Sequence, residues 1–261
     1  MKQRYTLAKA WIGQMGAYLR QAVRNPFDFS AKTSHQDIVT AYDKEVERFF
    51  RSQIHTHFPE DDIVGEEYSG KIGETRGIRW YIDPIDGTTN FVNLRRNFAI
   101  SVGCYRDGEP QFGLVLDVIQ EDLYAAFRGE GAYKNETRLT NDRAPGDLGL
   151  MILSTPNVLD TFWREYPWQT SLRELADAVR AVRSVGSVAL ELCLVAEGAV
   201  DIFVAMRSAP WDHNGARLIL QEAGCRLSQL GETSLCLDRE VAVYACRSAG
   251  TEALLRSNYH F

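Results

Sequence analysis

Apolar residues recur at a helical spacing in the first fifty positions of this chain. They stand at Leu7, Trp11, Met15, Tyr18 and Ala22, and again at Ile38, Tyr42, Val46 and Phe49. Steps of three and four residues place side chains on one face of a helix. The sequence therefore predicts two amphipathic helices at the start of the chain, each covering a sheet.

Short segments rich in β-branched and aromatic residues follow these helices. Turn-forming pairs such as Asp107-Gly108 separate some of them, which is typical of hairpins. We expect strands at 62–64, 79–83, 98–105, 112–118 and 123–127. The last three are expected to form a meander, so the first half of the chain is predicted to be antiparallel.

The pattern changes after Pro145-Gly146-Asp147, where strand segments begin to alternate with helical ones. Such alternation is typical of an α/β arrangement. We expect strands at 151–153, 182–184, 201–204 and 241–245, and helices at 171–179, 187–197 and 212–223. The chain is thus predicted to be one domain with an α+β lobe (1–143) and an α/β lobe (144–261).

Composition narrows the classes of function. The chain has 261 residues, of which 45% are hydrophobic, so it can bury a sizeable core. A net charge of -6 without a block of Lys or Arg argues against nucleic-acid binding. Polar Gln14, Arg20 and Gln21 interrupt the N-terminal apolar face, which predicts a cytoplasmic protein without a signal peptide or membrane span. The five cysteines form no CxxC pair and are expected to be reduced core residues.

The segment WYIDPIDGTTNFV, residues 80–92, raises a chemical question, because two aspartates follow an apolar run. Pro84 disfavours the α region for the residue before it, so a strand is expected to end at Asp83. Gly87 permits a sharp turn, after which a short helix is expected to begin.

Asp83, the Ile85 carbonyl and Asp86 are then expected to converge beside the first amides of that helix. Two bare carboxylates repel each other, whereas a divalent cation stabilises the pair, and hard oxygen donors suit Mg²⁺. A metal beside a helix N-terminus is a suitable place for a phosphate group.

Each acidic position also has an ordinary structural explanation. Asp-Pro and Asp-Gly are common turn pairs, Glu66 suits a surface position after a strand, and Asp212 suits a helix N-cap. Together, however, these residues place carboxylates at the ends of elements, where rigid scaffolds usually hold catalytic groups.

These motifs resemble those of the inositol monophosphatase family, which is related to fructose-1,6-bisphosphatase. The similar segments are DIVTAYD (37–43), GEE (65–67), DPIDGTTNF (83–91), RSVGSVAL (183–190) and WDHNGARLILQEAG (211–224). The resemblance covers essentially the whole chain. It implies a five-layer αβαβα sandwich, the sugar phosphatase fold, with Mg²⁺-dependent, lithium-sensitive hydrolysis of phosphate monoesters, commonly by a homodimer.

The resemblance also implies the metal ligands. Glu66, Asp83 and the Ile85 carbonyl resemble the ligands of a first ion, and Asp83, Asp86 and Asp212 those of a second. Two or three Mg²⁺ ions per active site are implied. One ion lowers the pKa of the attacking water and another stabilises the leaving alkoxide, so no covalent phosphoenzyme is needed.

The implied catalytic set consists of Asp43, Thr88 and Glu66. The Thr88 hydroxyl and Asp43 resemble the pair that orients and deprotonates the water. The amides of Gly87 and Thr88 resemble the phosphate cradle. Glu67 matches either a group that supports the ligand beside it or a simple surface acid.

Further positions match contacts to the substrate. Gly186 and Ser187 lie in the loop that approaches the non-phosphate part of the substrate in the family, and Asp212 is also expected to face the substrate. Lys32 matches a lysine near the phosphate or a third metal, although a solvated lysine explains it equally well.

One departure concerns the substrate. Inositol-preferring members have a glutamate seven residues before the WD aspartate, and here that position is Ala205. Losing a polar partner for hydroxyls can cost several orders of magnitude in discrimination. We therefore expect the ester to be an inositol monophosphate-like, sugar, polyol or nucleotide phosphate, with NADP(H) 2′-phosphatase or fructose-1,6-bisphosphatase-like activity as alternatives. A regulatory binding partner is the alternative from another class, which the complete acidic set disfavours.

Overall fold

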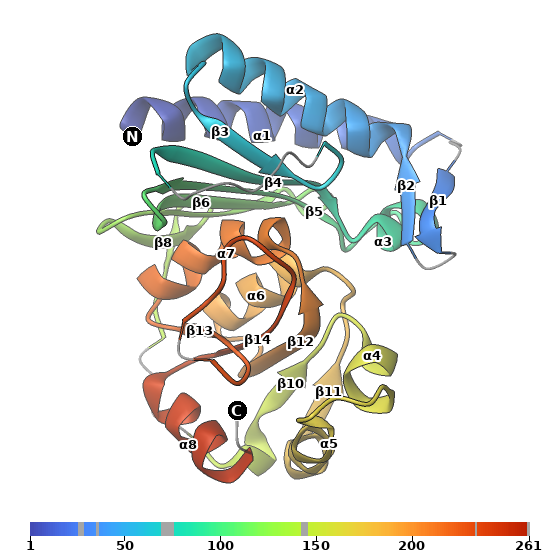
Figure 1. Ribbon diagram of the computed structural model, residues 1–261, viewed down its shortest axis with the longest axis vertical. Coiled ribbons are helices and arrows are strands. Elements are labelled where there is room, and N and C mark those ends of the chain that lie inside the picture. Colours follow the sequence, from blue (N-terminus) through green and yellow to red (C-terminus); the bar gives the residue numbers. More distant parts are fainter. Residues whose placement is uncertain (26–28, 35–36, 69–75, 142–145, 233, 260–261) are drawn as a thin grey trace.

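The computed structural model describes residues 1–25, 29–34, 37–68, 76–141, 146–232 and 234–259, and Figure 1 shows its layers. Two sheets face each other, with helices between them and on both outer faces. The first layer is α1 (Lys2–Ala22) with α2 (Ala41–His57), and the central layer is α6 (Val188–Glu197) with α7 (Pro210–Glu222). The last layer contains α4 (Val158–Trp163), α5 (Gln169–Ala178) and α8 (Ala249–Tyr259). The predicted five-layer αβαβα sandwich is confirmed.

The larger sheet lies between α1/α2 and α6/α7 and has seven strands in sequence order. These are β3 (Asp62–Gly65), β4 (Ile78–Asp86), β5 (Ala99–Arg106), β6 (Glu109–Asp117), β7 (Asp122–Phe127), β8 (Gly131–Lys134) and β9 (Thr137–Leu139). Neighbours from β4 to β9 pair antiparallel, as expected, but β3 pairs parallel with β4. The connection between β3 and β4 is longer than a tight hairpin, which parallel pairing requires.

The smaller sheet has five strands in the order β11-β10-β12-β14-β13. These are β11 (Ala181–Arg183), β10 (Ile152–Ser154), β12 (Ile202–Ser208), β14 (Val241–Cys246) and β13 (Arg226–Gln229), and a 3₁₀ turn, η1 (Leu148–Leu150), precedes β10. β10 pairs parallel with both β11 and β12, whereas β14 pairs antiparallel with β12 and β13. The second half therefore has the expected alternation of strands and helices.

The second helix begins later than its apolar spacing predicts. Ile38 lies in strand β2 (Asp37–Thr40), which pairs with β1 (Phe29–Ser34), and α2 begins only at Ala41. Thr40 is extended, with φ -114° and ψ 168°, and its side chain accepts a hydrogen bond from the Tyr42 amide. This N-cap stops the helix from extending toward the N-terminus.

The backbone of helix α7 lies in close contact with the backbone of the larger sheet, because glycines of the sheet face the helix. Gly103 on β5 and Gly113 on β6 are directly opposite each other. A Cβ on Gly113 would lie 2.1 Å from the Gly215 carbonyl oxygen, and one on Gly103 would lie 2.6 Å from the Asn214 carbonyl oxygen. The two halves of the chain therefore share a continuous core.

That shared core includes Ala99 and Val115 from the larger sheet together with Phe203 and Val243 from the smaller one. The proposed lobe boundary at residue 143 lies outside the described residues. All five cysteines are free thiols, and four of them are buried. In the described part of the chain, no helix is both long and apolar enough to cross a membrane.

Candidate active site

Strand β4 carries both aspartates of the DPID motif, because it continues through Pro84 to Asp86 and does not end at Asp83 as predicted. Asp83 pairs with Ser101, but Asp86 pairs with Ala99, so β4 has one extra residue there. An extra residue on one strand is a β-bulge, where a proline without an N–H is tolerated. Both carboxyl groups are buried, with Asp83 3% and Asp86 7% exposed.

Asp86 joins the larger sheet to the start of α6. Its carboxylate accepts hydrogen bonds from Ser187 Oγ (2.5 Å) and from the amides of Val188 (3.1 Å) and Ala189 (2.6 Å). Burial raises the pKa of Asp86 to about 6, although these hydrogen bonds favour its ionised form. An aspartate from the first half of the chain thus supplies the negative charge at the N-terminus of α6.

Asp83 lies in the field of several other acids. Burial raises the pKa of its carboxyl well above the ordinary value, and repulsion by Glu66, Asp86, Asp212 and Asp43 adds to the shift. The pKa of Asp212 is also raised well above its ordinary value, first by burial and then by Asp86 and Glu66. The structure therefore brings the implied metal-binding acids within electrostatic range of one another.

No group of three or more His, Cys, Asp or Glu side chains converges closely enough to enclose an ion among the residues that the structure describes. The donor set nevertheless fits a hard divalent cation. Buried carboxylates that repel one another are stabilised by positive charge, and their oxygens are the ligands that Mg²⁺ prefers.

Asp212 occupies the first turn of α7, where its carboxylate accepts a hydrogen bond from the Ala209 amide at 2.7 Å. Ala209 is the N-cap of this helix and Pro210 its first residue, so Asp212 is the third helical residue and not the N-cap considered from the sequence. This bond fixes the position of the Asp212 carboxyl relative to the helix axis.

Asp43 and Thr88 are in contact although they lie 45 positions apart. Thr88 Oγ1 is 3.2 Å from Asp43 Oδ1 and 3.1 Å from the Ile85 carbonyl oxygen. Asp43 Oδ2 accepts hydrogen bonds from the amide and hydroxyl of Thr40 at 2.7 and 2.6 Å. The capping box of α2 therefore orients Asp43 so that its other oxygen faces Thr88.

Gly87 forms the turn between β4 and α3 (Thr88–Asn93), near β2 in Figure 1. Its φ is 92°, a left-handed conformation that favours glycine. A Cβ here would lie 3.1 Å from the Gly186 carbonyl oxygen. The turn thus touches the loop that carries Gly186 and Ser187, two of the predicted substrate contacts.

Sequence reasoning missed Glu47, which is fully buried on α2. Its carboxylate accepts hydrogen bonds from the Glu67 amide at 2.6 Å and the Tyr68 amide at 3.2 Å, and it pairs with Arg51 at 2.7 Å. Glu47 therefore holds the backbone just after Glu66. Its position four residues after Asp43, an acid on a buried helix face, was the signal that could have found it.

Three other predicted positions have different surroundings. Ala205 is 1% exposed on β12 and belongs to the shared core. Glu67 is half-buried and its backbone, as noted, bonds to Glu47. Lys32 lies in β1, but its side chain is outside the described part of the structure.

Residues 1–258 match the model of the inositol monophosphatase family. The chain belongs to this family. It is 43% identical over 219 residues to the inositol-1-monophosphatase of Bacillus subtilis strain 168, with 84% of this chain and 82% of the relative covered.

Solved structures of inositol monophosphatases agree with this membership. 2′AMP-bound SaIMPase-II is 31% identical with a TM-score of 0.87, covering 98% of this chain and 94% of the other. An IMPase/NADP phosphatase complexed with Mg²⁺ and phosphate is 25% identical with a TM-score of 0.88, with 98% and 94% covered. The family prediction is confirmed, and this family member is a phosphoric monoester hydrolase.

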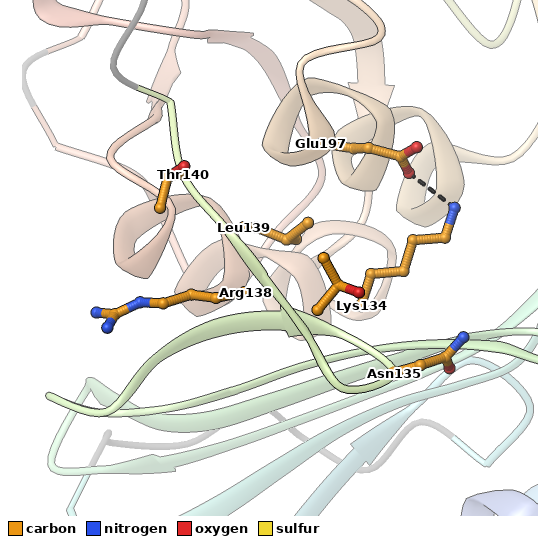
Figure 2. Close-up of a pocket in the computed structure, with 7 residues that line it drawn as sticks. Lys134, Asn135, Arg138, Leu139, Thr140 and Glu197 are labelled. Atoms are coloured by element: carbon orange, nitrogen blue, oxygen red, sulfur yellow. Dashed lines mark hydrogen bonds and ion pairs between the residues drawn. The ribbon is translucent and has the colours of Figure 1, made fainter.

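A separate surface pocket lies at the far end of α6 from Asp86. Figure 2 shows it, lined by Lys134, Asn135, Arg138 and Glu197 among others. Lys134 pairs with Glu197 and Asp122, each at 3.0 Å, so its charge is balanced within the protein. This pocket contains none of the predicted site residues.

Proposed function

We propose that this inositol monophosphatase family member hydrolyses small phosphate monoesters with Mg²⁺ held by Glu66, Asp83, the Ile85 carbonyl, Asp86 and Asp212. The observation that supports these ligands is the position of Asp83 and Asp212 beside other acids, where burial and repulsion by those acids raise the pKa of both carboxyls. Two or three bound Mg²⁺ ions would lower the pKa of a water molecule and balance the charge of the phosphate.

The side chains around that cluster would handle the water and its proton. Thr88 Oγ1 contacts Asp43 Oδ1, so the hydroxyl is placed to accept a hydrogen bond from the attacking water while it donates to Asp43. Asp43 is fully buried and held by Thr40, so it keeps this orientation as the proton moves. The amides of Gly87 and Thr88 would bind the phosphate oxygens.

The alcohol part of the ester would contact Gly186 and Ser187, with Asp212 and Lys32 nearer the phosphate. The position that carries a glutamate in inositol-preferring members holds the buried Ala205, which offers no side-chain hydrogen bond to a polyol. The 2′AMP-bound and NADP-phosphatase relatives support nucleotide esters as substrates alongside inositol phosphates. We therefore include both kinds of ester, with sugar phosphates, in the proposed range.

The test is phosphate release from inositol 1-phosphate, 2′-AMP, NADP⁺, fructose 1,6-bisphosphate and β-glycerophosphate, with Mg²⁺ or with EDTA. We expect Mg²⁺-dependent turnover that lithium inhibits and that Asp86→Asn abolishes. The matched control is Asp117→Asn, because Asp117 accepts turn hydrogen bonds from Ile119 and Gln120 outside the acidic cluster. Turnover that survives Asp86→Asn or EDTA would overturn the proposed metal chemistry.

A regulatory binding role is the outcome to consider if folded protein binds Mg²⁺ by calorimetry yet releases phosphate from none of these esters. A homodimer and a cytoplasmic location belong to the same proposal. Sedimentation at several protein concentrations tests the dimer.

A further inference from the structure

A second buried glutamate, Glu191, lies at the other side of the candidate site, on the first turn of α6. Its carboxylate accepts hydrogen bonds from Ser154 Oγ at 2.6 Å and from the amides of Val185 at 2.7 Å and Gly186 at 2.9 Å. The side chain has no exposed surface. Desolvation raises the pKa of Glu191 to about 7, while the three hydrogen bonds favour the ionised form.

These contacts fix the loop at residues 184–187, which joins β11 to α6. Ser154 lies on β10, so Glu191 connects the loop to the smaller sheet. Asn90 Nδ2 contacts the Val185 carbonyl oxygen at 2.7 Å from the opposite side, and Ser187 donates to Asp86. The loop is therefore held between the two sheets by polar contacts on both sides.

The hydrogen bonds to Glu191 constrain the backbone of this loop more than the contacts on its other side do. Gly186 has a left-handed φ of 83°, and its amide and that of Val185 both point at the same glutamate oxygen. Removing that acceptor would leave two part-buried amide donors without their partner, which favours a movement of the loop outward to reach water. Any such movement would carry Ser187 and Val188, which bind Asp86, along with it.

We propose that Glu191 is a positioning residue that sets the place of loop 184–187 and thereby determines which alcohol part of an ester the site accepts. This inference rests on the proposed phosphatase function. Glu191 itself bonds to the loop backbone and to Ser154, and acts on the substrate only through the loop.

The experiment compares Glu191→Leu, Glu191→Gln and the wild type. Leucine keeps the approximate volume and removes the acceptor, whereas glutamine keeps one oxygen for the two amides and can donate to Ser154. The matched control is Glu197→Leu at the other end of α6, where the carboxylate bonds Tyr124 and Lys134 and not the loop. For each protein, kcat and KM are measured with the best ester of the panel above and with p-nitrophenyl phosphate, whose alcohol part is different.

In Glu191→Leu we expect KM for the best ester to rise at least about tenfold, the factor that corresponds to one lost hydrogen bond to a buried group. The increase for p-nitrophenyl phosphate should be clearly smaller, so the ratio of the two kcat/KM values changes. Glu191→Gln should restore the ratio, and Glu197→Leu should leave it at the wild-type value.

Two results would overturn the inference in distinguishable ways. If wild type and variants all turn over and Glu191→Leu lowers the Tm with an unchanged ratio, Glu191 contributes only to folding. If the wild-type protein hydrolyses no ester, the proposed function fails and the inference with it.

Discussion

Substituting Gly113 with alanine tests whether the close contact between α7 and the larger sheet positions Asp212. The new Cβ would lie 2.1 Å from the Gly215 carbonyl oxygen, a backbone atom that cannot rotate away. Carbon and oxygen atoms normally approach to about 3.3 Å. Helix α7 would therefore have to move away from the sheet by about 1 Å, as judged from that minimum contact.

This displacement has two separable consequences. Overpacking of this kind destabilises a core by about 1–3 kcal/mol. Because Asp212 is on the first turn of the same helix, its carboxyl would move relative to Asp83 and Asp86, and a shift of about 1 Å can cost about 100-fold in rate. We therefore expect Gly113→Ala to lose more activity than its stability alone explains.

Urea unfolding gives the stability change, and kcat/KM with saturating Mg²⁺ gives the activity of the folded fraction. Gly13→Ala is the control: Gly13 is exposed on α1, and nothing lies within 4 Å of its added Cβ. That variant should gain about 0.5–1 kcal/mol from the higher helix propensity of alanine and keep full activity. A Gly113→Ala protein with wild-type stability and rate would refute the reasoning.

Three further predictions concern charge and hydrogen bonding at the site. In EDTA the free energy of unfolding should fall as the pH rises from about 4 to about 6, by up to about 3 kcal/mol for Asp86 alone. The reason is that the raised pKa of Asp86 lets the native state hold a proton that the unfolded chain has already released. Urea titrations that show stability rising over this pH range would contradict this prediction. Glu47→Leu should weaken Mg²⁺ binding by about 10- to 100-fold in calorimetry, because the backbone after Glu66 loses its hydrogen-bond acceptor. The surface variant Glu130→Leu should bind Mg²⁺ as the wild type does. An unchanged Kd in Glu47→Leu would show that Glu47 does not position the metal ligand Glu66. Thr88→Val should lower kcat by about 100-fold or more, and a normal kcat would exclude the proposed proton path.

The sequence by itself determined most of the regular elements. The spacing of Leu7, Trp11 and Met15 predicted α1, and the hairpin signal at Asp107-Gly108 predicted the β5–β6 turn. The spacing of apolar residues and the presence of turn-forming residues are local properties, so they can be recognised from neighbouring positions in the sequence. Some elements have weaker local patterns, and the sequence did not predict them. These are β1, β2, β8, β9, β13, α4 and α8.

The motifs also indicated which acids belong to the candidate site, but not how those acids are held. Asp83 and Asp86 are neighbours in the sequence, yet their separation across a bulge depends on pairing with β5. Pro84 suggested a strand end because its effect on the chain is local, whereas the strand continues because β5 supplies hydrogen bonds on both sides of the bulge.

Only the tertiary structure decided the contacts that join distant segments. Asp86 meets Ser187 across 101 positions, Thr88 meets Asp43 across 45, and Glu191 meets Ser154 across 37. No local pattern encodes these pairs, because they depend on how two sheets pack around α6 and α7. The sequence named the chemical groups of the site, and the close packing of α7 on glycines places Asp212 beside the sheet that carries Asp83 and Asp86.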